Sequence, residues 1–515
     1  MPGLNDRLTP LVLLAPAAVL GVVAWLLPSL PDADYWTRFP ARYLLADDRW
    51  RGFWEMLWVS DNGHRIPLAH LNYLVNFHWF AGSNYGLFAM TGLFAVATAG
   101  FLVGALRTVR GVARAGDVPL VFALVLSPAA IFHWVSPMSG AHWLFADALW
   151  AAALLALARY AVNLRIGDAV LACGLAILAA FAFTTGLVAL ALISCGIVLV
   201  APRSRRMVLA LLAVNGVFYL AYFTFVFDLG GKTLEGPDLV RAVAFFLSAA
   251  GNHFSARPIG IIPATIAGTV LIVAWLLLLG RLAAGAMGAS RRRVAIVIGI
   301  LGAYALINLA LIAIARHSME LTVSLTTRYG NIATLLLLAA IVGWIEFESG
   351  LRRRWMCWIS IAALVGVGYL KGVAELAVYH YGYLQRAPVD RLAVMLDLPE
   401  VPGADSYVHF PADPALVEAL RRHGHVPFSD FDRPMSLGTR LPGRPGIPID
   451  PEASMPVRNG WTRIEFLAPD LPDEVDLVDV DTGRVAGAAV RVGNRYIGYA
   501  RPGTAGLSAR EPVLQ

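Results

Sequence analysis

Cysteine and charged residues are both scarce in this 515-residue chain. Its three cysteines, Cys173, Cys195 and Cys357, lie in apolar runs, and none has the Cys-x-x-Cys spacing of a metal or redox site. This pattern excludes a disulfide framework and a cysteine-based zinc site. Charged residues make up 15% of the chain, against about 25% in a typical soluble domain. The sequence also lacks the His-Glu-x-x-His, P-loop, Gly-x-Ser-x-Gly and EF-hand motifs, and with them the chemistry that each defines.

Long apolar runs dominate the chain instead. Hydrophobic residues account for 58% of it, and the mean hydropathy is +0.64. A helix needs about 20 apolar residues to cross a bilayer, and runs near this length recur through the first three-quarters of the chain. We therefore expect an all-α polytopic membrane protein of about 11 transmembrane helices, with a small C-terminal extracytoplasmic α+β domain. The expected spans are 11–30, 85–106, 118–135, 143–157, 169–183, 187–201, 207–227, 259–279, 294–315, 332–345 and 355–374.

The positive charge indicates topology rather than nucleic-acid binding. The formal net charge is +6. Arginines gather in short loops that alternate with loops that are not basic, and the basic loops are 107–114, 159–165, 203–206, 281–293 and 352–354. Basic loops remain on the cytoplasmic side of a membrane. The pattern therefore predicts a cytoplasmic N-terminus and, after an odd number of spans, a C-terminus outside. No nucleic-acid partner is expected.

The chain changes character near residue 380. Segment 1–379 is expected to form a transmembrane domain, and the polar, proline-rich segment 380–515 a separate periplasmic domain that acts as a cap or an acceptor-binding module. A short helix is predicted at 414–423, with Asp413 as its N-cap. Short β-like runs separated by turn residues predict a small antiparallel unit. These runs are 461–466, 474–480, 484–492 and 495–500.

The first outer loop, residues 31–84, brings acidic and aromatic residues together. Short helices are expected at 50–59 and 67–80, and the tryptophans of the loop, Trp36 among them, suit the headgroup region of a membrane. Asp32 and Asp34 stand just beyond the first span. A carboxylate there can be the general base that deprotonates an acceptor hydroxyl in an inverting sugar transfer. The alternative is two solvated acids that mark the end of a helix.

A second candidate is the segment 61–67, with the sequence DNGHRIP. Asn-Gly is a strong turn signal, and this turn would present His64 and Arg65 at the start of a helix. The guanidinium fork matches a phosphate, and histidine can donate or shuttle a proton. Glu55 precedes the turn and can orient either residue. The alternative is a surface turn with Arg65 among lipid headgroups.

A third candidate lies between the ninth and tenth expected spans. Arg316, His317, Arg328 and Tyr329 occur there, on the outer face, against the positive-inside trend. A lipid phosphate or pyrophosphate would satisfy this charge. The alternatives are Glu320 as an ionic partner or contact with lipid headgroups.

Asp147 is an ionisable residue within the fourth expected span, which makes it a functional hypothesis by default. His133, His142 and Lys371 fall near the same outer level and are candidates to neutralise it. The alternative is a set of buried polar residues. The two histidines alone are a weak indication of a metal.

Three patches of the sequence are together similar to a known family. They are NGHRIP in the first loop, Thr-Arg-Tyr at 327–329, and YVHFPADPALVEALRRHGHVPFSDF at 407–431. With a first span that enters from the cytoplasm, acids at the start of a long outer loop, many further spans and an outer C-terminal domain, the chain resembles the GT-C superfamily of membrane glycosyltransferases. Within it, the chain is similar to a bacterial group whose members mostly lack assigned substrates.

This resemblance implies a sugar donor carried on polyprenyl phosphate, a base in the first loop, and a site that opens to the periplasm at the bacterial inner membrane. It assigns the base to Asp34, with Asp32 as rival, and the donor phosphate to Arg328 and Arg65. Many relatives have an adjacent acidic pair, whereas Ala33 separates the acids here. That departure leaves open which acid is the base and whether a metal takes part. No cofactor is expected beyond a divalent metal, which no motif indicates.

The expected function is transfer of the sugar to an extracytoplasmic glycan or lipid, with membrane lipids as further partners. A lipid or glycan transporter or flippase is an alternative, but the helix break at 184–186 has no counterpart in a second half, as transporters tend to show. A lipid-pyrophosphate-dependent polymerase or ligase shares the expected architecture. A non-catalytic assembly protein would tolerate substitution of the first-loop acids.

Overall fold

The computed structural model describes most of the chain as helix, and it divides the chain into two compact units. The described residues are 3–31, 35–36, 40–61, 63–112, 114, 116–200, 205–227, 238–284, 288–347, 350–382, 384–396, 398, 414–429, 437, 446–457, 460–468, 470–501, 504 and 506–510. The first unit comprises Met1–Trp25, Leu57–Asn72 and Leu87–Ala377. The second comprises Leu26–Met56, Tyr73–Gly86 and Val378–Gln515.

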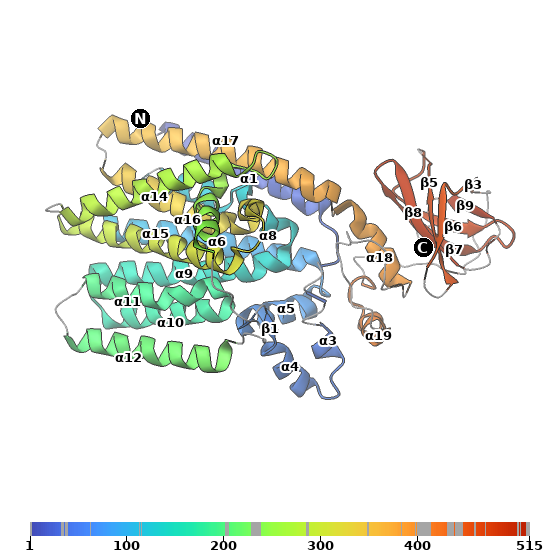
Figure 1. Ribbon diagram of the computed structural model, residues 1–515, viewed down its shortest axis with the longest axis horizontal. Coiled ribbons are helices and arrows are strands. Elements are labelled where there is room, and N and C mark those ends of the chain that lie inside the picture. The colour runs from blue at the N-terminus through green and yellow to red at the C-terminus, as the bar shows by residue number, and fades with distance from the viewer. Residues whose placement is uncertain are drawn as a thin grey trace. The chain divides into compact units, whose positions relative to one another are not determined.

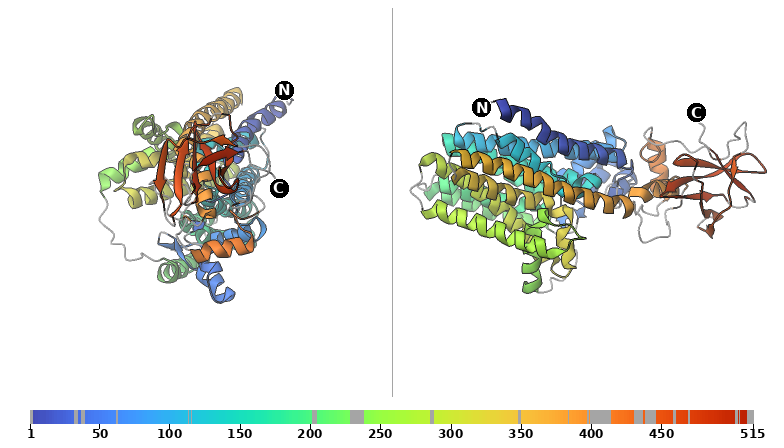
Figure 2. Two further views of the ribbon diagram at one scale, coloured as in Figure 1. Left: turned by 90° about the vertical axis from the view of Figure 1, so that its right-hand side faces the viewer. Right: turned by 90° about the horizontal axis from the view of Figure 1, so that it is seen from above.

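Helices build the first unit, and the long ones lie side by side along a common direction while α13 runs across it (Figures 1 and 2). They are α1 (Gly3–Leu26), α6 (Asn84–Arg110), α7 (Asp117–Val125), α8 (Phe132–Val135), α9 (Pro137–Asn163), α10 (Ile166–Ala182), α11 (Ala189–Val200), α12 (Arg205–Ala221), α13 (Leu239–Ala250), α14 (Ile261–Ala284), α15 (Ala289–Arg316), α16 (Gly330–Phe347) and α17 (Gly350–Gly382). Short 3-10 turns connect some of them: η1 (Pro128–Ala130), η2 (Thr184–Val188), η4 (Asn252–Phe254), η5 (Leu321–Leu325) and η6 (Thr327–Tyr329). A π-helical turn, η3 (Tyr222–Val226), ends α12.

Six helices of the described part of the chain are long and apolar enough to cross a membrane. They are Asn84–Arg110, Pro137–Asn163, Arg205–Val226, Ile261–Arg281, Ser290–Arg316 and Thr327–Glu346. Each expected span contains a helix, but the expected number of spans is not reached. Four further apolar helical stretches of the described part, Asp117–Ala130, Ile166–Ala182, Thr184–Val200 and Leu239–Ala250, have 10–17 residues, short of the roughly 20 that cross the hydrocarbon core. Proline at 128 and the 3-10 turn η1 interrupt the expected span 118–135, and η2 separates the expected spans 169–183 and 187–201.

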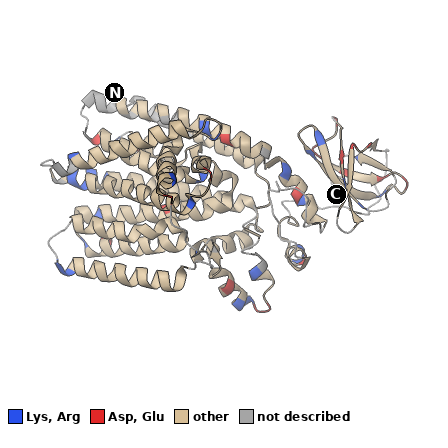
Figure 3. Cartoon of the chain, viewed as in Figure 1, with Lys and Arg blue, Asp and Glu red and all other residues tan. Residues whose placement is uncertain are grey.

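Small side chains let the helices approach closely. Ala172, Ala176 and Ala179 repeat every three or four residues along α10, and all three are fully buried, which places them on one face of the helix. Where α13 crosses α14, a Cβ on Gly268 would lie 1.9 Å from the carbonyl oxygen of Leu247. Only glycine permits this crossing. Charged residues are sparse along the long helices, and Lys and Arg gather near their ends (Figure 3).

The C-terminal part of the second unit contains a seven-stranded antiparallel sheet that forms a small half-barrel (Figure 1). Its strands, in the order β3-β9-β6-β7-β8-β5-β4, are β3 (Ile447–Pro448), β9 (Leu507–Arg510), β6 (Glu474–Asp479), β7 (Val485–Val492), β8 (Arg495–Ala500), β5 (Thr462–Phe466) and β4 (Ala453–Pro456). The four predicted strands correspond to β5–β8. Phe466, Leu477 and Tyr496 lie in its core. Helix α18 (Ala387–Met395) precedes the sheet, and α19 (Pro414–His423) matches the predicted helix. Asp413, its expected N-cap, lies outside the described residues.

The first outer loop contains α3 (Pro40–Leu44), α4 (Arg49–Leu57), α5 (Pro67–Trp79) and the two-residue strands β1 (Ser60–Asp61) and β2 (His64–Arg65). Helices α4 and α5 confirm the two short helices expected there. Trp50 and Trp79 are 66% and 78% exposed, which fits the expected headgroup role. Trp36 does not fit, because it is fully buried. In the second unit, α19 packs against α3, and the amide of Val426 donates to the carbonyl of Ala81 at 3.0 Å.

Candidate functional site

The connection between α15 and α16 is held by buried hydrogen bonds. Ser324 and Thr327 are fully buried. The side-chain amide of Asn252 donates to the carbonyl oxygens of Ser324 and Thr326, at 2.7 and 3.0 Å. The hydroxyls of Ser248 and Ser324 are 2.7 Å apart. Buried main-chain carbonyls require such donors, so this connection has a defined conformation.

Lys371 of α17 binds the oxygen atoms of Asn252, whose side-chain amide holds the α15–α16 connection. The lysine is 4% exposed. Its ammonium donates to the main-chain and side-chain oxygens of Asn252 and lies 3.5 Å from the carbonyl oxygen of Leu325. A buried ammonium group is costly unless acceptors surround it. Lys371 therefore ties α17 to the α15–α16 connection, and the expected contact with Asp147 is replaced by this one.

Arg328 extends from η6 toward α8. Its guanidinium lies over the ring of Phe132, 4.4 Å from the centroid, where the negative face of the ring attracts it. The amide of Phe132 donates to the hydroxyl of Thr327 at 3.1 Å, and His133 Nε2 lies 2.9 Å from the carbonyl oxygen of Arg328. The arginine is half-buried. No carboxylate among the described residues forms an ion pair with it.

Tyr329 and His142 lie in an aromatic layer beside Arg328. Tyr329 is 4% exposed, and its ring centroid is 6.3 Å from that of Trp143 and 6.0 Å from that of Phe245. His142 is 5% exposed and packs on Phe183 with a centroid separation of 4.6 Å. Tyr329 thus anchors the turn that presents Arg328.

Asp147 lies in the bundle with 2% of its surface exposed. One carboxylate oxygen accepts from the amide of Asn331 at 2.8 Å, and the other from the hydroxyl of Tyr304 at 3.3 Å. The ring of Tyr304 stacks on Trp150 with a centroid separation of 4.3 Å. The hydrogen-bond partners of Asp147 within the described chain are therefore neutral. The basic candidates His133, His142 and Lys371 are not among these described partners, and the alternative of a set of buried polar residues fits better.

Arg65 follows the predicted turn. Gly63 has a φ of 89°, the left-handed region that glycine adopts most readily. Arg65 Nη1 donates to the carbonyl oxygen of Phe225 at 2.5 Å, where α12 ends in its π-helical turn. Such turns are frequent at functional sites. Arg65 is half-buried and makes no ion pair with a described carboxylate. The side chain of His64 lies outside the described part.

Arg316 and Arg241 meet at Met319. Arg316 Nη1 lies 3.7 Å from the sulfur of Met319, and Arg241 Nη2 donates to its carbonyl oxygen at 3.1 Å. Glu320 accepts from the hydroxyl of Thr322 at 3.3 Å. The considered pairing of Glu320 with Arg316 or Arg328 is not found among the described ion pairs. Both arginines therefore contact Met319, and neither forms an ion pair with an acid among the described residues.

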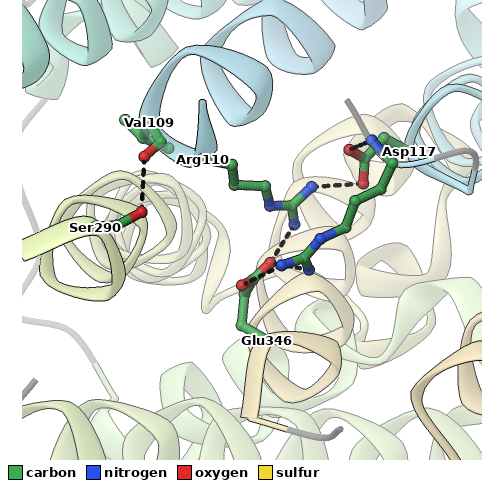
Figure 4. A network of polar contacts seen from close by, with 6 residues as sticks. Val109, Arg110, Asp117, Ser290 and Glu346 are labelled. Atoms are coloured by element: carbon green, nitrogen blue, oxygen red, sulfur yellow. Dashed lines mark hydrogen bonds and ion pairs between the residues drawn. The ribbon is translucent and has the colours of Figure 1, made fainter. Parts of the chain in front are cut away.

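Arginines at the other ends of α6 and α16 are neutralised by carboxylates. Arg110 lies between Asp117 and Glu346, at 2.6 and 2.7 Å (Figure 4). Arg114 also pairs with Glu346. Ser290 of α15 donates to the carbonyl of Val109 nearby, at 3.4 Å. At one end the chain therefore supplies acids to buried arginines, whereas Arg328, Arg316 and Arg65 form no ion pair with an acid among the described residues.

Asp32 and Asp34, the expected bases, lie outside the described residues, but their neighbours on both sides are held in the second unit. Trp36 is fully buried, and its indole N–H donates to the carbonyl oxygen of Pro31 at 2.9 Å. Tyr35 is 1% exposed, and it accepts a hydrogen bond from the amide of Asn76 at 3.4 Å. Burial raises the pKa of Tyr35 well above its usual value.

Asn84 fixes the chain that leads into the acidic segment. Its side-chain amide donates to the carbonyl oxygens of Pro28 and Leu30, at 3.0 and 2.6 Å. Its main-chain amide donates to Ser29 at 2.8 Å, and the hydroxyl of Tyr85 donates to Leu27 at 3.2 Å. The start of α6 therefore defines the position of residues 27–30.

Glu55 is on α4 in the second unit. It forms an ion pair with Arg51, one turn earlier, at 2.7 Å, and its side chain is 43% exposed. An exposed pair of this kind contributes roughly 0–1 kcal/mol. The carboxylate can therefore leave its partner at little cost.

No protein-family model matches the chain, and no curated protein matches it. Among the described residues, no group of three or more His, Cys, Asp or Glu side chains is arranged to hold a metal ion.

The sequence interpretation missed the neutral residues that organise the site. Asn331 and Asn252 are the most important, with Tyr304 and Ser324. Asn331 stands two residues after Tyr329, at the start of an apolar helix. An amide at such a position is a signal that could have been used, because a buried amide must find partners.

Proposed function

We propose that this protein is a membrane glycosyltransferase that moves a sugar, with inversion, from a polyprenyl-phosphate donor to an extracytoplasmic glycan or lipid. The observation that carries the proposal is the state of Arg328, which is half-buried, held in a defined turn, and without an acid partner among the described residues. A guanidinium fork of this kind matches a phosphate. The resemblance of the sequence to the GT-C superfamily and the six apolar helices support the same function.

Arg328 and Arg65 are proposed to hold the donor phosphate, with Arg316, His64 and Tyr329 as supporting residues. Phosphate-binding groups are most effective when they are fixed in advance and partly shielded from water. The ring of Phe132 and the carbonyl of Phe225 fix the two arginines in this way. The prenyl chain of the donor would lie among apolar helices.

Asp34 is proposed as the general base, with Asp32 and Glu55 as rivals. The base accepts the proton of the acceptor hydroxyl while its oxygen attacks the anomeric carbon. The bond from this carbon to the phosphate oxygen breaks, and polyprenyl phosphate leaves with the electron pair. The hydrogen bond from Trp36 to Pro31 supports the assignment, because it fixes the chain on both sides of the acids.

The basic helix ends support an orientation in the bacterial inner membrane. Arginines at the end of α6 and the start of α12 and α15 would face the cytoplasm. The N-terminus would then be cytoplasmic and the C-terminal half-barrel periplasmic.

A transfer assay on purified protein in nanodiscs tests the proposal. A panel of polyprenyl-phosphate sugars is offered with candidate acceptors, and release of polyprenyl phosphate is measured. Wild type is expected to release it from one donor, and Asp34→Asn to be slower by about 10²–10⁴-fold, as for loss of a general base. Asp47→Asn, an exposed acid of the same loop, is the matched control and is expected to remain active.

The other outcomes separate the alternatives. Full activity of Asp34→Asn would move the role to Asp32 or Glu55. Release only from lipid-pyrophosphate glycans would identify a polymerase or ligase. Movement of the lipid across the bilayer without covalent change would refute the enzyme in favour of a flippase.

A further inference from the structure

We propose that Asp147 is a positioning residue which, through Asn331 and His133, fixes the main chain at Arg328 and so the guanidinium assigned to the donor phosphate. The inference rests on the proposed function. It is carried by a continuous chain of buried hydrogen bonds that joins α9, α16, α8 and η6.

The direction of each hydrogen bond follows from the chemistry of its groups. The carboxylate of Asp147 accepts, so the Nδ2 atom of Asn331 must face it, at 2.8 Å. Asn331 Oδ1 then faces His133 Nε2, at 3.2 Å. Because an amide oxygen only accepts, His133 must carry its proton on Nε2. That proton also faces the carbonyl oxygen of Arg328, at 2.9 Å.

The remaining contacts of His133 agree with this tautomer. Its Nδ1 atom is left as an acceptor, and the hydroxyl of Ser139 lies 3.4 Å from it. His133 is fully buried, and Asn331 is 8% exposed. Water therefore cannot easily replace a lost partner within this set. A change at Asp147 or Asn331 would leave the amide of Asn331 without its fixed orientation. His133 would then no longer be held in one tautomer, and the carbonyl of Arg328 would lose its fixed donor.

Helix α8 holds Arg328 at two points, which is why the relay affects the side chain. His133 contacts the main chain of Arg328, and the neighbouring Phe132 lies under its guanidinium, at 4.4 Å. If the carbonyl of Arg328 rotates, the turn η6 rotates with it and the guanidinium moves off the ring. A displacement of about 1 Å at a binding group is enough to weaken binding strongly.

Binding of a polyprenyl monophosphate to the full-length protein in nanodiscs tests the relay. Asn331→Leu is expected to raise the Kd about tenfold, as for loss of a hydrogen bond to a charged group. The matched control is Asn215→Leu, which removes another side-chain amide contact of the same unit, the half-buried hydrogen bond to Ser194 at 2.8 Å. The control is expected to leave the Kd within about twofold.

A double-mutant cycle separates positioning from general stability. If Asn331 acts through Arg328, Arg328→Ala raises the Kd, and adding Asn331→Leu to it has no further effect. A further rise by the full factor of the single variant would overturn the relay. An unchanged Kd in Arg328→Ala would instead refute the phosphate contact of the proposed function, and the two failures are thus distinct.

A second pair of variants replaces Asn331→Leu if that variant does not fold. His133→Gln retains an N–H donor at the end of the side chain and is expected to keep the affinity, whereas His133→Leu loses it. Equal affinities of the two variants would overturn the relay.

Discussion

Removal of Arg110 is expected to destabilise the bundle strongly. Its side chain is 3% exposed and bonds Asp117 and Glu346, which are 8% and 11% exposed. Breaking a buried ion pair by removing one partner costs about 3–5 kcal/mol, because a buried charge is left without compensation. We therefore expect Arg110→Met to lower the free energy of unfolding by about this amount.

The structure shows where the uncompensated charge would fall. Without Arg110, Glu346 keeps the guanidinium of Arg114, whose Nη2 lies 3.1 Å from it. Among the described residues, the carboxylate of Asp117 keeps the main-chain amide of Arg114, at 3.3 Å, as its one hydrogen-bond donor. Most of the loss should therefore come from Asp117, and Arg110→Met combined with Asp117→Asn should recover a large part of it.

Thermal unfolding in detergent, followed by tryptophan fluorescence, measures both variants. The expected decrease in Tm for Arg110→Met is about 5–10 °C. Arg51→Met, which removes an exposed ion pair with Glu55, is the matched control and should change the Tm by less than about 2 °C. The reasoning is refuted if the double variant is as unstable as Arg110→Met alone, or if Arg110→Met behaves like the control.

Three further predictions concern the second unit. Asn84→Ala removes hydrogen bonds to two buried carbonyls and should lower stability by about 2–4 kcal/mol; an unchanged Tm would contradict the anchoring role. Trp36→Phe keeps the ring but loses the hydrogen bond to Pro31, and should reduce sugar transfer while shifting the Tm little; normal transfer would separate this bond from catalysis. Burial, with His423 and His78 nearby, lowers the pKa of His425 from 6.5 to about 4. The folded state therefore resists protonation, so stability is full above pH 6.5 and falls as the pH decreases toward 4. Unfolding midpoints across this range should show that slope in wild type and lose it in His425→Gln.

Local features of the fold were predictable from the sequence because they depend on local composition. The helix at 414–423 and strands β5–β8 follow from periodicity and turn residues within a few positions. Strands β3, β4 and β9 were missed. Strands β3 and β4 are short and end in proline. Strands β3 and β9 are defined by pairing with strands that are distant in the sequence, whereas β4 pairs with the next strand, β5.

The partners of the candidate residues were harder to predict, because they come from far along the chain. Asp147 and Asn331 are 184 residues apart, and Lys371 and Asn252 are 119 apart. Basic residues were expected around Asp147 on charge alone. The bundle instead supplies one amide, from Asn331, and one hydroxyl, from Tyr304, which satisfy a carboxylate without bringing a second buried charge.

The clamp that Asn84 forms on residues 28–30 has a consequence for how the chain is made. All residues of this clamp have been synthesised as soon as α6 leaves the ribosome. The segment between α1 and α6 can therefore adopt its folded conformation early. Val426, which bonds Ala81, is translated about 340 residues later, or roughly 20–70 s at typical rates of synthesis. During that interval the carbonyl of Ala81 and the face of Phe77 that packs on His425 remain open. The segment that contains Asp32 and Asp34 can therefore fold first, and the contacts of Ala81 with Val426 and of Phe77 with His425 form last.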